Sequence, residues 1–404
     1  MTVHFEPCTY SGEIKAPPSK SVAHRLLICA GLSAGESRID GIYDSDDISA
    51  TLDCLAASGA VIRRRGGSAA VRGADPRGRT RCVFGCRESG STLRFLLPVA
   101  LLSDQPAIFT GSDRLLSRPL GVYEDICAAR GLRFERTPGG LTAAGRLRGD
   151  AFSVPGNISS QFISGLLFAL PLAEEDSVID IIPPVESASY IEMTLDSLSR
   201  FGITVERRGN RIKIPGGQTY SPADAAVEGD WSGAAVYFAL NATGSDIRVS
   251  GLPEVSHQAD SAVAEIIERM SRRRCTVDIS GCPDLAPVLM AVAPALRGVR
   301  LTGTSRLRLK ESDRGAVMAA ELKKCGVDAV PGENSIDIPK TRMHAPDVPL
   351  CGSGDHRIVM ACSILLSLLG GDLEGAEAVN KSYPRFFADL GSLSKLPTGK
   401  NRRQ

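Results

Sequence analysis

The chain has 404 residues, of which 43% are hydrophobic, 23% charged and 5% aromatic, and its formal net charge is +1. This length predicts two or three domains, and the composition is that of an ordinary globular protein. The near-zero charge and the shortness of the arginine runs, such as residues 63–65, argue against a nucleic-acid-binding protein.

The 11 cysteines indicate neither a disulfide framework nor a zinc site. Their number is odd, and the closest pairs, Cys82/Cys86 and Cys275/Cys282, lack the spacing of zinc knuckles. Free thiols in this number fit a reducing compartment, so we expect a cytoplasmic protein. The N-terminus does not resemble a signal peptide and the apolar stretch 358–369 is too short to span a bilayer, so no membrane partner is expected.

A helical run, a punctuating residue and an alternating strand recur along the chain. The punctuating positions are 59, 131, 202, 274, 326 and 391, all glycine except Arg274, and the first four are almost evenly spaced. Each glycine is expected to end a helix in the left-handed conformation. Units of this length are too long for solenoid repeats, so the pattern predicts six small α/β units, three in each of two domains.

Two boundaries divide the chain. The Pro17–Pro18 pair disfavours helix, and a second break follows the Gly- and Pro-rich stretch at 215–222. We therefore predict a first, discontinuous domain of residues 1–18 plus 229–404 and a second domain of residues 19–228. Strand-forming residues near 5–14 then belong with the second half of the chain.

The first candidate binding segment follows Pro18. Ser19 is suited to cap a helix whose first turn would present backbone N–H groups, Lys20 and Ser21 to an anion. Arg25 would share a face with Ser21, four residues earlier. The alternative is a well-capped surface helix without a ligand.

Three more helix starts are rich in hydroxyl groups and small residues, at 88–94, 156–162 and 230–233. Gly90 would let a ligand approach the backbone closely. Such starts suit a polyhydroxylated or phosphorylated ligand that is held by many modest hydrogen bonds.

Two charged segments follow in the second half. Lys310 and Arg314 are four residues apart and would repel each other on a helix unless an anion lies between them; the alternative is a solvated face balanced by Glu311 and Asp313. In the segment 352–357, the expected helix cap is Asp355.

That cap would leave Arg357 to meet an anion, whereas His356 is read as structural. Lys381 is expected at the start of the last helix. Cations placed at element starts in a chain of almost no net charge favour a concentrated anion pocket over a diffuse nucleic-acid surface.

In this order the segments resemble the EPSP synthases, the 3-phosphoshikimate 1-carboxyvinyltransferases of the enolpyruvyl transferase family. The specific motifs are Pro18-Ser19-Lys20-Ser21…His24-Arg25, Leu309-Lys310-Glu311-Ser312-Asp313-Arg314 and Asp355-His356-Arg357, and the resemblance runs from about Ser11 to Gly391. It implies a two-domain inside-out α/β barrel built of three βαβαββ-type units per domain, with the active site in the cleft between the domains. It also implies a monomer without metal or cofactor.

The implied reaction transfers the enolpyruvyl group of phosphoenolpyruvate to the 5-hydroxyl of shikimate 3-phosphate, in the shikimate pathway to chorismate and the aromatic amino acids. The implied catalytic residues are Asp284 as proton acceptor, Glu311 and Lys20. Implied contacts to shikimate 3-phosphate are Lys20, Ser21, Arg25, Ser159, Ser160, Gln161, Ser187, Asp284 and Lys310. Implied contacts to phosphoenolpyruvate are Lys20, Gly90, Arg118, Gln161, Arg314, Arg357 and Lys381.

Asp284 would be a stronger base if burial outweighs the nearby cations. Glu88 and Arg306 depart from the family pattern, which often has Asn at both positions. The resemblance further implies that glyphosate competes with phosphoenolpyruvate in a pocket that Gly90 leaves roomy.

The alternative acceptor is UDP-N-acetylglucosamine, used by the sister enolpyruvyl transferase. That enzyme has a reactive cysteine in the loop before its Arg-Pro pair, whereas the loop 111–117 before Arg118 has none. RNA 3′-phosphate cyclase is a more distant relative. A non-catalytic phosphosugar-binding protein would need the cations but not Asp284 and Glu311.

Overall fold

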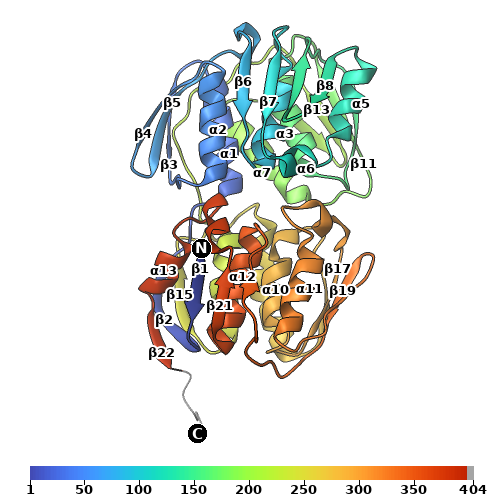
Figure 1. The fold of residues 1–404 in the computed structure, drawn as a ribbon. Coiled ribbons are helices and arrows are strands. Elements are labelled where there is room, and N and C mark those ends of the chain that lie inside the picture. Colours follow the sequence, from blue (N-terminus) through green and yellow to red (C-terminus); the bar gives the residue numbers. More distant parts are fainter. Residues whose placement is uncertain (398–404) are drawn as a thin grey trace. The chain divides into compact units, whose positions relative to one another are not determined.

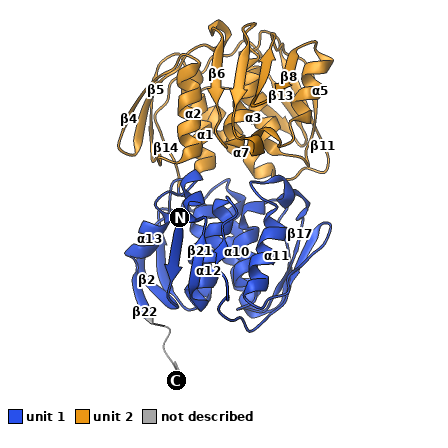
Figure 2. Cartoon of the chain, in the orientation of Figure 1, with its two compact units in different colours: residues 1–19, 229–404 blue, residues 20–228 orange. Residues whose placement is uncertain are grey.

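In the computed structural model, which describes residues 1–397, the chain forms two compact units (Figure 2). Unit 1 comprises Met1–Ser19 and Gly229 onward, and unit 2 comprises Lys20–Glu228. Ser19, expected at the start of the second domain, groups with unit 1. The strand β2 (Cys8–Lys15) pairs with β15 (Asp246–Ser250) and β22 (Ser394–Pro397), so the N-terminal strands lie with the C-terminal half as predicted.

Unit 2 contains three of the six sheets found in the described residues (Figure 1). Its strands are β3 (Glu36–Asp40), β4 (Val61–Arg65), β5 (Ser68–Arg72), β6 (Cys82–Gly85), β7 (Ala107–Thr110), β8 (Arg133–Thr137), β9 (Gly140–Ala144), β10 (Ala151–Pro155), β11 (Ser177–Ile182), β12 (Glu206–Arg208), β13 (Arg211–Ile214) and β14 (Ala225–Ala226). Its helices are α1 (Lys20–Leu32), α2 (Asp46–Ala57), α3 (Gly90–Ala100), α4 (Asp113–Leu116), α5 (Gly121–Ala129), α6 (Ser160–Ala169) and α7 (Ala188–Arg200), with short 3₁₀ turns η1 (Pro76–Gly78) and η2 (Leu170–Leu172).

Unit 1 contains the other three sheets of the described chain. Besides β2, β15 and β22, its strands are β1 (Thr2–Phe5), β16 (Cys275–Asp278), β17 (Val299–Thr302), β18 (Val330–Pro331), β19 (Ser335–Ile338), β20 (Leu350–Cys351) and β21 (Gly371–Glu374). Its helices are α8 (Trp231–Ala242), α9 (Val263–Arg272), α10 (Ala286–Val292), α11 (Arg314–Lys324), α12 (His356–Leu369) and α13 (Phe386–Ser392), with 3₁₀ turns η3 (Ala259–Ala262), η4 (Pro283–Leu285), η5 (Ser305–Leu309) and η6 (Ala376–Lys381).

One strand pattern recurs in every sheet of the described residues. A parallel pair is extended by an antiparallel neighbour, as in β6–β7–β9–β8, where β6 and β7 are parallel and β9 is antiparallel to both β7 and β8. The same order occurs in β10–β11–β13–β12 and β16–β17–β19–β18. In β14–β3–β5–β4 the last strand of unit 2 supplies the parallel edge. The sheets therefore bear out a repeated α/β unit, three to each compact unit.

The helices form the interior and the sheets lie outside. Ten residues of α1 and all of α10 are buried, and α10, which is apolar on every side, is typical of a core helix. Within unit 2, α3 packs on α6 and α1 packs on α2 and α7. Strand β3 alternates buried and exposed residues, as expected where one face of a sheet meets solvent. This arrangement is the inside-out α/β fold.

The predicted glycine caps are mostly present. Gly59, Gly131, Gly202 and Gly326 have φ values of +108°, +63°, +77° and +81°, a region that costs little only for glycine. Gly391 was wrongly predicted as a cap, because it lies inside α13.

Within residues 1–397, no helix combines the length and apolar character needed to cross a bilayer.

Candidate active site

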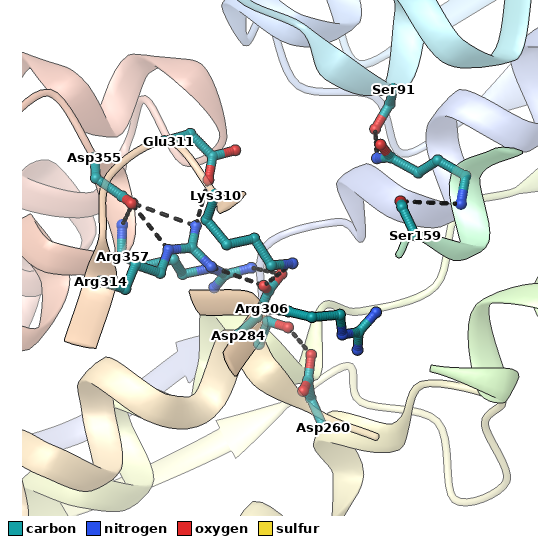
Figure 3. A network of polar contacts seen from close by, with 12 residues as sticks. Ser91, Ser159, Asp260, Asp284, Arg306, Lys310, Glu311, Arg314, Asp355 and Arg357 are labelled. Carbon is teal, nitrogen blue, oxygen red and sulfur yellow. Dashed lines mark hydrogen bonds and ion pairs between the residues drawn. The ribbon is translucent and has the colours of Figure 1, made fainter. Parts of the chain in front are cut away.

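Unit 1 gathers the charged residues around Arg314 (Figure 3). Arg314 opens α11 behind the N-cap Asp313, and its side chain is only 2% exposed. Its guanidinium donates Nε to Asp355 Oδ2 at 2.9 Å, Nη1 to Asp284 Oδ1 at 2.8 Å and Nη2 to Glu311 Oε2 at 2.7 Å. Burial works against the charge, yet these carboxylates raise the pKa of Arg314 well above its ordinary value.

Asp284 lies between Lys310 and Arg314, where the sequence left open either an anion or a solvated face. It lies in η4, just before α10, and its Oδ1 also accepts a hydrogen bond from Lys310 Nζ at 3.0 Å. Arg357 Nη2 is 3.9 Å from Oδ2. Lys310 is the extended residue after η5, not part of a helix, so the expected helical repulsion does not arise.

The cations decide the protonation of Asp284. Burial alone would raise its pKa, but Lys310, Arg314 and Arg357 outweigh burial and hold the pKa well below its usual value. Burial in turn lowers the pKa of Lys310. The condition under which Asp284 would be a stronger base, that burial outweighs the nearby cations, is therefore not met, and Asp284 is a stabilised carboxylate.

The start of α12 completes this cluster. Asp355 caps the helix as predicted, since its Oδ1 accepts from Arg357 N at 2.9 Å, and its Oδ2 also accepts from Ser312 Oγ at 2.9 Å. The buried Arg357 has a raised pKa because Asp230 and Asp284 outweigh its burial. Lys381 Nζ donates to Gly354 O at 2.7 Å, which places it beside the start of α12. Lys381 ends η6, so its expected place at the start of α13 is wrong.

In unit 2, Lys20 opens α1 as predicted and forms an ion pair with Asp47 at 2.7 Å. The predicted Ser19 cap is wrong, because the buried Ser19 Oγ makes no hydrogen bond within the described residues. Arg25 lies on the same face as Ser21 and donates Nη1 to Ser21 O at 2.7 Å.

The Arg25 guanidinium is buried among neutral oxygens. Nε donates to Thr194 Oγ1 at 2.9 Å and Nη2 to Tyr190 O at 3.0 Å. Burial lowers the pKa of Arg25 to about 10. Ser187 precedes α7 in the left-handed region, with φ of +56°, and Tyr190 N donates to its carbonyl at 3.1 Å.

Gln161 links two of the hydroxyl-rich helix starts. Its Nε2 donates to Ser91 Oγ at 3.0 Å and its Oε1 accepts from Arg94 Nη1 at 2.8 Å. Ser159 caps α6 by accepting from Gln161 N at 3.3 Å, and Ser160 is buried in the first turn.

Gly90 lies against Arg118, since a Cβ built on Gly90 would be 2.7 Å from Arg118 Nη1 and 3.2 Å from Arg94 Nη1. Gly90, Arg118 and Gln161 therefore share one neighbourhood, which Arg94 organises.

A chain of buried hydroxyls joins α1 to the start of α3. Thr92 Oγ1 donates to Ser89 Oγ at 2.7 Å, Thr51 Oγ1 is 2.7 Å from Thr92 Oγ1, and His24 Nδ1 is 2.8 Å from Thr51 Oγ1. Burial, with the charges of Lys20 and Arg25, lowers the pKa of His24 well below its ordinary value, so the ring is neutral. The network ties the Lys20 helix to the helix that presents Gly90.

Sequence reasoning missed Arg94 as an organising residue and Asp47 as the partner of Lys20. An arginine in the otherwise apolar run 93–102 was the available signal for Arg94, because a buried charge needs partners.

Of the two departures from the family pattern, Glu88 is half-buried and Arg306 is buried, with Nη2 donating to Ser280 O at 2.8 Å. In the part of the chain that the structure describes, no group of His, Cys, Asp and Glu side chains is arranged to hold a metal ion.

The fold is shared with solved structures. EPSP synthase from Acinetobacter baumannii aligns with a TM-score of 0.77 at 24% identity, covering 96% of this chain and 97% of that chain. A second structure of the enzyme from this organism gives 0.75 at 22% identity. The chain is thus of the two-domain inside-out α/β class.

The sequence comparisons are more specific. The family model described as EPSP synthase (3-phosphoshikimate 1-carboxyvinyltransferase) matches residues 6–276 and 271–390. The 3-phosphoshikimate 1-carboxyvinyltransferases of Clostridium kluyveri and Clostridium perfringens are each 38% identical, the first over 97% of both chains and the second over 98% of this chain and 99% of the relative. The chain belongs to the EPSP synthase family of transferases.

Proposed function

We propose that the chain transfers the carboxyvinyl group of phosphoenolpyruvate to the 5-hydroxyl of shikimate 3-phosphate, giving 5-enolpyruvylshikimate 3-phosphate and phosphate. Family membership over nearly the whole chain supports this reaction. The structural observation that carries it is Asp284 held between Lys310 at 3.0 Å and Arg314 at 2.8 Å. A carboxylate fixed among cations can accept a proton from an alcohol while the cations hold anionic substrates.

We assign the residues as the resemblance implies. The proposed shikimate 3-phosphate site is Lys20, Ser21, Arg25, Ser159, Ser160, Gln161, Ser187, Asp284 and Lys310. The proposed phosphoenolpyruvate site is Lys20, Gly90, Arg118, Gln161, Arg314, Arg357 and Lys381. Both sets draw on the two units, so we propose that the substrates bind between them.

The proposed chemistry has two steps. The 5-hydroxyl oxygen bonds to C2 of phosphoenolpyruvate as its proton passes to Asp284, and C3 gains a proton from Lys20 or Glu311. The tetrahedral intermediate then loses phosphate from C2 and a proton from C3, which leaves the enol ether. Two phosphates and two carboxylates enter with the substrates, and their charge offsets the cations that depress the pKa of Asp284.

Phosphate release with both substrates tests the activity. We expect release that requires shikimate 3-phosphate and is not supported by UDP-N-acetylglucosamine. A folded chain that binds shikimate 3-phosphate but releases no phosphate would instead be a non-catalytic binding protein. We further propose a cytoplasmic location, because the cysteines are unpaired thiols. We also propose a monomer, as the resemblance implies; a dimer in size-exclusion chromatography would contradict it.

A further inference from the structure

A second buried carboxyl, that of Asp260, lies beside Asp284 and the charged cluster of unit 1 (Figure 3). Asp260, in η3, is only 4% exposed. Its Oδ2 accepts a hydrogen bond from Ser232 Oγ, whereas Oδ1 has no hydrogen-bond partner in the described residues. A buried carboxylate oxygen without a partner is costly, so such a group either binds a proton or serves a purpose that offsets the cost.

The turn that carries Asp260 is held firmly in place. Gln258, which precedes η3, accepts from Trp231 N at 3.0 Å and donates Nε2 to Gly229 O at 2.8 Å. These bonds fasten η3 to the start of α8. The backbone that carries Asp260 is therefore fixed beside the start of α8.

The groups that face Asp260 come from three elements. Asp230 and Ser232 lie at the start of α8, Asp284 and the buried Cys282 lie at η4, and Arg357 lies on α12. Burial raises the pKa of the Cys282 thiol to about 12, so it is neutral. Burial first, and then the charge of Asp284, raises the pKa of Asp260 to about 7, whereas that of Asp284 is held low. Two neighbouring carboxyls with pKa values pushed apart are typical of acid–base sites.

We propose that Asp260 is a positioning residue that acts through Asp284, its carboxylate supplying a negative charge that opposes the three cations and increases the proton affinity of Asp284. The inference rests on the proposed function, in which Asp284 takes the hydroxyl proton. An ionised Asp260 favours protonation of Asp284, because like charges raise the proton affinity of a neighbour. When Asp260 is protonated, Lys310, Arg314 and Arg357 act on Asp284 unopposed. Turnover should therefore rise with pH through the pKa of Asp260.

The first experiment compares pH profiles of kcat, followed as phosphate release, for the wild type and three variants. Asp260→Asn should lose the inflection expected near pH 7 and turn over about tenfold more slowly at about pH 8, with the KM values changed less. Ser232→Ala should move the inflection to higher pH, because the Ser232 hydrogen bond lowers the pKa of Asp260. Asp389 in α13 is a buried carboxyl that accepts a hydrogen bond from Tyr383. Asp389→Asn is therefore the control and should keep the inflection.

The second experiment needs no substrate. Infrared difference spectra of the unligated chain should show a carboxyl that titrates near pH 7 in the wild type and is lost in Asp260→Asn. The pKa of Asp260 is higher in the folded state than in the unfolded state. As the pH rises from about 4 to about 7, the melting temperature of the wild type should therefore fall relative to that of Asp260→Asn.

Two results would overturn the inference and leave the proposed function standing. One is turnover in a chain without the infrared signal, and the other is an Asp260→Asn variant that keeps the wild-type pH profile. A chain that shows the signal but releases no phosphate would overturn the proposed function, and with it the role through Asp284.

Discussion

The two units hold their buried arginines in opposite ways. In unit 1, Arg314 is surrounded by the carboxylates of Asp284, Glu311 and Asp355, and its pKa is raised. In unit 2, Arg25 is held by hydroxyl and carbonyl oxygens, and burial lowers its pKa to about 10.

The contrast separates two physical tasks. Neutral partners orient a guanidinium without cancelling its charge, which suits the capture of a phosphate group. Carboxylate partners cancel the charge but set the protonation of their neighbours, which suits proton transfer. We therefore expect variants in unit 1 to disturb stability and turnover, and variants in unit 2 to disturb substrate binding.

The largest expected effect comes from Arg314→Met. The change removes the cation from three carboxylates, of which Asp355 is fully buried and the other two are 19% exposed, and should lower the free energy of unfolding by about 3–5 kcal/mol. Urea denaturation measures it. Arg272→Met is the matched control, because its pair with Glu268 is exposed on α9 and is worth about 0–1 kcal/mol. Equal losses of unfolding free energy in Arg314→Met and Arg272→Met would contradict the prediction that the buried pairs of Arg314 stabilise the fold more than an exposed pair does.

Asp284→Asn should spare substrate binding and depress turnover by about 10²–10⁴-fold, the usual contribution of a general base. Calorimetry with shikimate 3-phosphate and phosphate-release assays measure the two quantities. Asp337→Asn, at an exposed position of β19 paired with Arg274, is the control. A near-normal rate in Asp284→Asn would remove its proposed role.

Thr92→Val tests the hydroxyl network of unit 2. The change breaks the hydrogen bonds from Thr92 Oγ1 to Ser89 and Thr51, so each of these buried hydroxyls loses one of its partners, at a cost of about 1–3 kcal/mol. We expect the KM for phosphoenolpyruvate to rise more than kcat falls, because the start of α3 shifts. Thr142→Val on β9 provides the comparison, and the idea fails if both variants leave the KM unchanged.

Gly90→Ala should have the smallest effect on turnover. Its new methyl group would be 2.7 Å from Arg118 Nη1, so the flexible end of that side chain must move. We expect the inhibition constant of glyphosate to rise more than kcat falls. Gly121→Ala, also at a helix start but with open space around its Cβ, should change neither, and equal inhibition of wild type and Gly90→Ala would contradict the prediction.

Local signals predicted part of the site. The start of α1 at Lys20 and the Asp355 cap follow from short-range rules of helix ends, whereas the helical spacing assumed for Lys310 and Arg314 is wrong, because Lys310 precedes α11 in extended backbone. The Ser19 cap and the position of Lys381 did not follow, because the Ser19 hydroxyl does not reach the N–H groups of α1 and a 3₁₀ turn takes the place of a helix at Lys381.

The sequence by itself determined the repeated α/β units, the helix starts rich in hydroxyl groups and cations, and the resemblance to a family. Only the tertiary structure decided that Asp284, 26 residues before Lys310, is the anion it contacts, and that Asp260 lies nearby. It also decided the protonation of both carboxyls. The reason is physical: a helix cap depends on residues a few positions away, whereas a pKa depends on burial and on charges that distant segments bring together.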